Sequence, residues 1–362
     1  MAILRKLLSA SLLLCSACAA PARSTEPARA QAAPAAPDPV YVFEGVEVFG
    51  LRKLPRDEVL KLIGMPAPGT RFNLEQGEFT PYLLESKPRL LAAHPLPFCR
   101  YSMVTYPPTH TFRVTVDLVE PGDEWRMRFD PPPTGMVEDP EGLIAAWGAY
   151  QQTYWKLRRE GAVPEQGLGG CQALSCYGGF DHPELAPLEG RFVDGVPRNT
   201  AALVRVLRED KDDAKRMTAV ILLSYVRSRE ELVRYLVPSV RDPFEGVRNE
   251  ALRLLGAAQE KPPKVLIPLE PVLEALAFPL SSDRNKAAWA LVRIVETEGA
   301  ARRARILERS GDMLLEMAGM RQAIDREPAR KVLTLLAGRD LGEDVGPWRE
   351  WVARTRAASS GP

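Results

Sequence analysis

Residues 242–255 read DPFEGVRNEALRLL, and residues 210–223 read DKDDAKRMTAVILL. When the two stretches are aligned, the opening Asp, one Arg, one Ala and the closing Leu pair fall at the same offsets. An Asp at the start of a helix accepts hydrogen bonds from free backbone N–H groups. The small Ala lets neighbouring helices approach, and the Leu pair fills the core between them. The two stretches therefore predict two copies of one packed helical unit.

Further copies continue the pattern toward the C-terminus. A looser copy lies at 282–291, and a fourth begins at Asp325. A spacing of roughly 30–45 residues is typical of two-helix repeats. Segments between the copies supply a first helix for each unit, at 200–207, 230–237, 270–277 and 312–318. We therefore predict an all-α solenoid over 199–352.

The form D-P-x-x-x-V-R-x-x-A-x-x-L-L at Asp242 resembles HEAT repeats. The resemblance implies an α-solenoid with a long surface for protein contacts, and it assigns the Asp and the Arg to the scaffold. Residues 336–351, LAGRDLGEDVGPWREW, resemble a closing segment of exported bacterial HEAT-type proteins. This implies that Trp348 and Trp351 seal the last repeat. Residues 353–362 are expected to form a disordered tail.

The first twenty residues have the features of a targeting segment. Arg5 and Lys6 precede an apolar run at 7–14, which is too short to cross a bilayer. Residues 15–18, CSAC, resemble a bacterial lipobox, which implies a lipid on Cys18, although that pattern prefers Leu or Val where this chain has Cys15. The alternative is ordinary cleavage after export. Both predict a periplasmic protein, and the lipoprotein form would be anchored to the outer membrane.

Residues 21–39 are rich in Ala and Pro and contain little that can be buried, so we expect an extended tether. The following residues, 40–121, predict a small α/β domain. Its expected elements are a strand at 41–50, helices at 54–64 and 75–92, and strands at 98–106 and 111–120.

This β-α-α-β-β order resembles a POTRA domain. The resemblance rests on VEVFGL at 46–51, LPRDEV at 54–59, PGTRFN at 68–73 and VTVDLVE at 114–120. It implies that the domain binds by adding a partner strand to an edge of its sheet. The fold class predicted for the whole chain is thus multidomain: a POTRA-like α/β domain followed by a HEAT-like α-solenoid.

Residues 122–198 are expected to connect the two parts. A helix at 140–161 carries Trp147, Tyr150, Tyr154 and Trp155 at helical spacing. One interpretation is core packing against the first helices of the solenoid. The other is an aromatic interaction face, which requires exposed rings.

A loop in the same region contains Cys171, Cys176 and His182. Two cysteines this close in an exported protein predict a disulfide, although Cys99 could take either one as its partner. The three residues could instead be zinc ligands. Asp181 beside His182 also suggests an activated cysteine nucleophile, which needs a thiolate that a disulfide would remove.

The composition and the absence of known motifs argue against several classes of function. The net charge is +1, with 48 basic against 47 acidic residues, which argues against binding nucleic acid. No P-loop, G-x-S-x-G, H-E-x-x-H or Gly-rich dinucleotide turn occurs. We therefore expect no catalytic residue, cofactor, metal or small-molecule substrate. The leading hypothesis is a non-enzymatic scaffold or assembly factor that binds envelope proteins. The alternative is an envelope enzyme or metal-binding protein built around the loop from Cys171 to His182.

Overall fold

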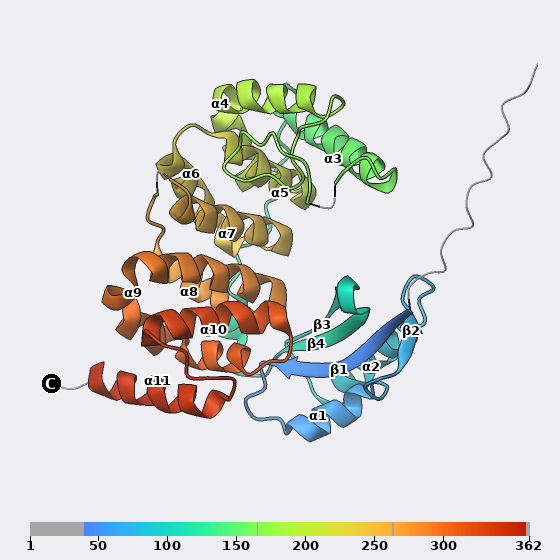
Figure 1. The fold of residues 1–362 in the computed structure, drawn as a ribbon, viewed down its shortest axis with the longest axis vertical. Coiled ribbons are helices and arrows are strands. Elements are labelled where there is room, and N and C mark those ends of the chain that lie inside the picture. The colour runs from blue at the N-terminus through green and yellow to red at the C-terminus, as the bar shows by residue number, and fades with distance from the viewer. Residues whose placement is uncertain (1–39, 165, 263, 360–362) are drawn as a thin grey trace, which may run out of the picture. The chain divides into compact units, whose positions relative to one another are not determined.

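The computed structural model describes residues 40–164, 166–262 and 264–359 (Figure 1). The targeting segment, Cys18 and the tether lie outside the described residues. Within them, a small mixed sheet over 40–119 is followed by a large helical region. None of the described helices combines the length and the apolar character that crossing a bilayer requires.

Four strands form the sheet, in the order β2-β1-β4-β3. Strand β1 runs parallel to β4, whereas the pairs β1–β2 and β3–β4 are antiparallel. The short β2, which the sequence did not predict, pairs with the first three residues of β1. The strands are β1 (Val40–Phe49), β2 (Arg71–Asn73), β3 (Phe98–Tyr106) and β4 (Thr111–Val119).

Two helices, α1 (Arg56–Ile63) and α2 (Thr80–Ala93), belong to the sheet domain. The alternation of apolar residues in β4 places Val114, Val116 and Leu118 in one core with Val59 of α1 and Leu90 of α2. The second helix was expected to begin near residue 75. It begins at Thr80 instead, where the following proline fits the first turn because that turn needs no N–H donor there.

Eight helices of the described region follow α3 (Leu143–Arg159). They are α4 (Ala186–Glu209), α5 (Asp213–Leu222), α6 (Arg229–Leu236), α7 (Glu245–Glu260), α8 (Leu269–Leu276), α9 (Ser281–Ala318), α10 (Ala323–Ala337) and α11 (Val345–Ser359). Short 3-10 helices lie at Pro107–Thr109, Glu124–Met127, Pro140–Gly142, Leu223–Tyr225 and Pro238–Arg241. Helices α6 and α8 match the predicted first helices closely. Helix α4, in contrast, begins well before residue 200, inside the expected connecting region.

The long α9 does not run straight. A straight helix of its 38 residues would extend about 57 Å. Yet the backbone N–H of Ser281, its first residue, donates to Asp117 Oδ2, and the carboxylate of Glu316, near its end, accepts from the N–H of Gly50. Gly50 directly follows Phe49, which pairs with Asp117 in the sheet, and a Cβ on Gly50 would be 2.3 Å from the carbonyl oxygen of Leu118. Helix α9 therefore folds back, and its two arms cover the predicted helices at 282–291 and 312–318.

Buried Arg–Asp pairs connect successive units of the stack. Arg216 Nη2 lies 2.8 Å from Asp242 Oδ1, and Arg248 Nη2 lies 2.7 Å from Asp283 Oδ2. Each arginine also donates to the carbonyl of the Asp that opens its own copy of the pattern, Asp210 or Asp242. The repeated Asp and Arg are thus structural, and they tie one unit to the next.

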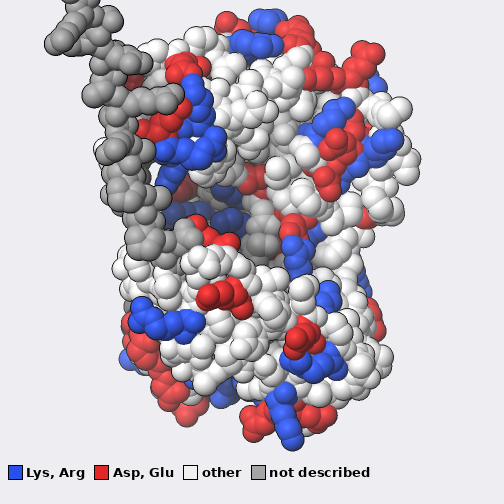
Figure 2. Space-filling view, turned by 90° about the vertical axis from the view of Figure 1, so that its right-hand side faces the viewer, with Lys and Arg blue, Asp and Glu red and all other residues white. Residues whose placement is uncertain are grey.

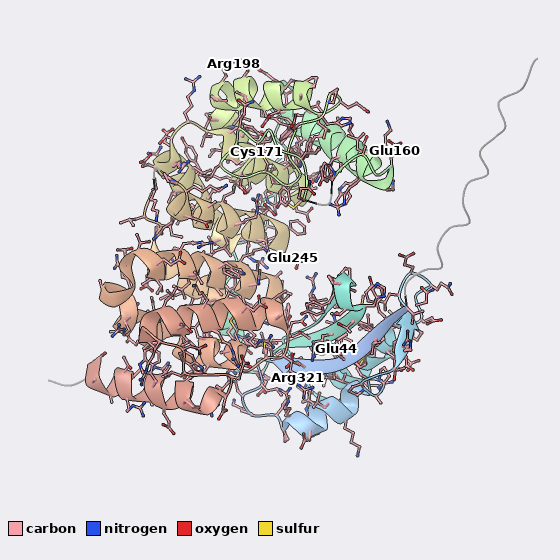
Figure 3. All side chains as sticks on the ribbon, viewed as in Figure 1. Glu44, Glu160, Cys171, Arg198, Glu245 and Arg321 are labelled. Atoms are coloured by element: carbon pink, nitrogen blue, oxygen red, sulfur yellow. A yellow bond between two sulfur atoms is a disulfide. The ribbon has the colours of Figure 1, made fainter. Side chains whose placement is uncertain are left out.

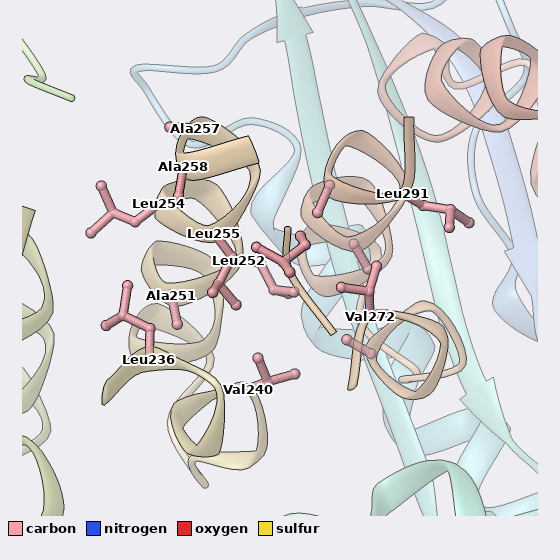
Figure 4. Packing of buried hydrophobic residues seen from close by; sticks show 14 of the residues in the cluster. Leu236, Val240, Ala251, Leu252, Leu254, Leu255, Ala257, Ala258, Val272 and Leu291 are labelled. Atoms are coloured by element: carbon pink, nitrogen blue, oxygen red, sulfur yellow. The ribbon is translucent and has the colours of Figure 1, made fainter. Parts of the chain in front are cut away.

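Apolar packing follows the same pattern. Leu252 and Leu255 of α7 extend toward Val272 of α8, while Leu254 points to the other side (Figure 4). All four side chains are buried. Burying an apolar side chain of this size stabilises the fold by about 1.5–3 kcal/mol. These side chains belong to one continuous core that runs through the stack.

The segment at 120–139, which includes the 3-10 helix Glu124–Met127, joins the sheet to α3 and crosses the turns of the stack. Arg126 Nε donates to the carbonyl of Ala277, and the N–H of Asp130 donates to the carbonyl of Arg241. Farther along, the N–H of Lys211 donates to the carbonyl of Gly135. The segment therefore fixes three successive turns, and in Figure 1 it passes behind the helices.

The sheet also contacts the stack directly. Glu47 of β1 accepts hydrogen bonds of 2.8 Å from the N–H groups of Arg321 and Gln322, just before α10. Arg100 of β3 donates to Glu245, which lies at the end of α7 nearest the sheet (Figure 3). The sheet domain is thus packed against the helices through these polar contacts and through Phe49 of β1, which is buried in the core of the helices.

The C-terminal residues depart from the expected tail. Residues 353–359 continue α11, so the prediction of disorder is wrong for them. Val352 is buried, and Arg356 donates to the carbonyl of Leu307 and pairs with Asp312 of α9. Trp348 is fully buried as well. These contacts hold the last helix against α9.

Candidate interaction surface

The aromatic helix predicted at 140–161 is α3. Trp147, Tyr150 and Tyr154 are buried, and their rings stack in sequence, with centroids 4.8 and 5.9 Å apart. These three rings therefore pack in the core, as the first interpretation expects, although all three also line the pocket described below. Trp155 differs, because its side chain is 53% exposed.

Cys171 and Cys176 form a disulfide, and Cys99 is a buried free thiol. Burial raises the pKa of Cys99 to about 11. The disulfide leaves no thiolate in this loop for a zinc ligand or a nucleophile. His182 Nδ1 accepts from the N–H of Glu184. Across the described ranges, no group of three or more His, Cys, Asp or Glu side chains could hold a metal ion.

Two glycines let the cysteine loop lie directly on α3. A Cβ on Gly178 would be 2.1 Å from Cε2 of Tyr154. Gly179 has φ +79°, and a Cβ there would be 1.9 Å from the carbonyl oxygen of Leu168. Tyr150 Oη then donates to the carbonyl of Gly179 at 3.1 Å. The disulfide and this contact hold both ends of a short segment that contains Tyr177.

Tyr177 faces the same side as Trp155. Its side chain is 51% exposed, and its ring lies 6.4 Å from that of Trp147. The guanidinium of Arg253, from α7, stacks 4.4 Å from the centre of the Tyr177 ring. Such a cation–π contact fixes the orientation of a surface ring by about 0.5–1 kcal/mol.

Together these residues border a pocket of about 330 Å³ between α3, α5, α7 and the cysteine loop. Its wall is mostly apolar and includes Trp147, Trp155, Tyr177, Met217, Ile221 and Glu250. Mostly apolar walls with a few polar groups are characteristic of binding sites.

The polar groups of the pocket differ in their pairing. The carboxylate of Glu250 lies 2.7 Å from Nη2 of Arg253, and burial raises the pKa of Glu250. Arg253 also donates to Ser175 Oγ. Arg158 stacks 5.8 Å from the centre of the Trp155 ring. Among the described residues, its guanidinium has no carboxylate partner.

A second pocket of about 250 Å³ adjoins the first, between α7 and α9. Gly256 and Ala290 lie in close contact at its base, and Trp289 at its border is 39% exposed. Arg253 separates the two pockets, since it stacks on Tyr177 and also lines the second pocket. We call the two pockets with Trp155, Tyr177 and Trp289 the aromatic groove.

A larger pocket of about 590 Å³ lies where the sheet meets the stack. Its acidic groups already serve structural contacts: Glu47 holds the start of α10, and Glu316 pairs with Arg52. The aromatic groove is therefore the stronger candidate for binding.

The helical spacing in the sequence indicated Trp155, but nothing in it pointed to Tyr177 or Trp289. Tyr177 directly follows Cys176, and Trp289 stands between two small residues in the third copy of the repeat. A single aromatic residue between small residues, as at Trp289, could have indicated an exposed ring. Only the fold, however, brings the three residues to one groove.

No family model matches the chain, and no curated protein matches it.

Proposed function

We propose that the chain is a non-enzymatic scaffold or assembly factor of the bacterial cell envelope, which binds another protein through the aromatic groove. The observation that supports this most is the gathering of three exposed aromatic rings at two adjoining pockets. Trp and Tyr are enriched among the residues that dominate binding energy at protein interfaces. Because the groove is built on packed helices, it is preorganised for a partner.

The finer identity of the two parts belongs to the same proposal. We infer that the stack is HEAT-like, because the Asp–Arg pattern recurs and its pairs connect neighbouring units. We also infer a POTRA-like sheet domain, with β4 at its centre and β3 along one edge. Strand β3 would be the edge that accepts a partner strand. The two parts together would offer two binding surfaces on one chain.

Location follows from the sequence of the first twenty residues. The positively charged start, the short apolar run and the small residues after it favour export. A lipid on Cys18 would attach the chain to the outer membrane, and residues 21–39 would act as the tether. A scaffold held in this way would act on proteins at the membrane surface.

Affinity capture with matched variants tests the proposal. The full chain, Trp155→Ala/Tyr177→Ala and Trp125→Ala would each be used to capture proteins from envelope extract of the native organism. Trp125 is the control, because its side chain is 45% exposed but lies on the connecting segment, outside the groove. We expect the double variant to lose a partner that the chain and the control retain. Identical captured sets for all three proteins would contradict the proposal.

A further inference from the structure

We propose that the aromatic groove takes an extended, acidic segment of its partner that contains proline. The inference rests on the proposed function and names the chemistry of the partner. It follows from three features of the groove: its unbalanced charge, the shape of its exposed rings and the adjacency of its two pockets.

Charge is the first feature. The two pockets are lined by five basic side chains and two acidic ones. Both acidic groups already have partners, since Glu250 pairs with Arg253 and Glu260 lies 2.8 Å from Arg293. The basic residues left without a carboxylate partner among the described residues are Arg158, Lys261 and Lys286. The groove is thus complementary to an acidic segment.

The same basic charge also argues against a cationic ligand, which aromatic rings often bind. Rings around a carboxylate can form a cage for a cation such as an alkylated ammonium group. Here the carboxylate of Glu250 is neutralised by Arg253, and guanidinium groups already stack on Tyr177 and Trp155. A cationic ligand would meet these charges at close range, so the groove disfavours it.

Ring shape is the second feature. Trp155 and Tyr177 leave about half of their surface free at the border of one pocket. Flat aromatic walls of this kind suit the pyrrolidine ring of proline, and proline-rich segments are already extended before they bind, so little entropy is lost. Met217 and Ile221 add apolar side chains to the wall of this pocket, against which such a ring can pack.

The third feature is that the pockets adjoin. Arg253 stands between them, and Trp289 borders the second pocket as Trp155 and Tyr177 border the first. An extended segment advances about 3.1 Å per residue, so a single segment can place side chains in both pockets. Figure 2 shows Lys and Arg side chains, with Asp and Glu side chains among them, in and beside a hollow on this side of the molecule. Acidic residues on either side of the proline would meet Arg158, Lys261 and Lys286, which line the two pockets.

Fluorescence anisotropy with a labelled synthetic peptide tests the inference. The probe carries two adjacent prolines between Asp and Glu residues. One control peptide has alanine for proline, and another has Asn and Gln for the acids. We expect the probe to bind the full chain more tightly than either control does, with an affinity that falls as salt rises.

Protein variants locate the binding. Trp155→Ala is expected to weaken binding of the probe by about tenfold or more, as truncation of an aromatic anchor does. Arg158→Gln should weaken probe binding by about threefold, which is in the range of an exposed ion pair, and should reduce the dependence of the affinity on salt. Trp125→Ala should bind as the unaltered chain does.

The outcomes separate this inference from the proposed function. Equal binding of the probe and the alanine peptide, or of the probe and the Asn/Gln peptide, overturns the inference. The inference also fails if the probe does not bind while Trp155→Ala/Tyr177→Ala loses an envelope protein that the unaltered chain captures. That result would leave the proposed function standing. If the double variant captures every protein that the chain captures, both fail.

Discussion

Arg284 Nη2 of α9 lies 2.8 Å from Asp117 Oδ1 of β4, and both side chains are fully buried. In the two preceding pairs of the stack, each arginine bonds to the Asp of the next unit. Here the Asp of the next unit, Asp325, lies 3.7 Å from Arg284 Nε, and the sheet supplies the hydrogen-bonded carboxylate instead. The sheet is thereby joined to the series of Arg–Asp pairs, which explains how the two parts form one packed unit.

Removing this arginine should destabilise the whole chain. We expect Arg284→Met to lower the free energy of unfolding by about 3–5 kcal/mol, because two carboxylates remain buried without their cation. The matched control is Arg302→Met on the same helix, whose exposed pair with Glu298 contributes less than about 1 kcal/mol. Urea denaturation followed by circular dichroism measures both. Equal effects of the two substitutions would show that the buried pair has no special role.

Asp325 should make stability depend on pH. Burial raises its pKa to about 6, whereas the unfolded value is about 3.9. Between these pH values the folded state holds a proton that the unfolded state has lost. The contribution of Asp325 to the free energy of unfolding is therefore greatest below about pH 4 and is lost as the pH rises through about 6. We expect Asp325→Asn to remove that part of the slope. Urea midpoints from pH 4 to 7 test this; parallel curves for the two proteins would refute it.

The disulfide should stabilise the loop that carries Tyr177. Cys171→Ser/Cys176→Ser is expected to lower the free energy of unfolding by about 2 kcal/mol, the chain-entropy value for so short a loop. Reductant should shift the thermal midpoint of the unaltered chain and leave that of the variant unchanged. If reductant shifts both proteins equally, the stabilisation comes from elsewhere.

Two glycines near the groove should respond to alanine in opposite directions. Gly178→Ala places a methyl group against the ring of Tyr154, so we expect a loss of about 1–3 kcal/mol. A Cβ added at Gly148 in α3 would meet nothing within 4 Å, and alanine there should stabilise the helix by about 0.5–1 kcal/mol. Thermal unfolding compares them. A stabilising Gly178→Ala would mean that the loop does not lie on α3.

Local patterns account for much of the fold that the sequence predicted. Period-two alternation located β4, and the repeated Asp, Arg and Leu pair located α5 and α7. The predictions failed where distant contacts decide the structure. Residues 353–359 are helical because α9 provides a surface for Arg356 and its neighbours, and Asp117 looks like an ordinary solvent-facing strand residue until Arg284 is brought against it.

The aromatic residues show the same limit. Helical spacing correctly grouped Trp147, Tyr150 and Tyr154, but the spacing of one helix does not tell a buried face from a binding face. Trp155 is exposed because it lies beside that face, and the groove also needs Tyr177 and Trp289 from separate segments. The sequence therefore indicated the aromatic residues that α3 contributes to the candidate site, and packing brought Tyr177 and Trp289 to them.

The most direct test of binding at the groove is photo-crosslinking in intact cells. A photoreactive amino acid would replace Trp155 in one version of the full chain and Trp125 in another. We predict an adduct to an envelope protein from position 155, lost when Tyr177→Ala is added, and attached to an acidic, proline-containing segment. Absence of an adduct at position 155, or the same adduct from both positions, would contradict the account.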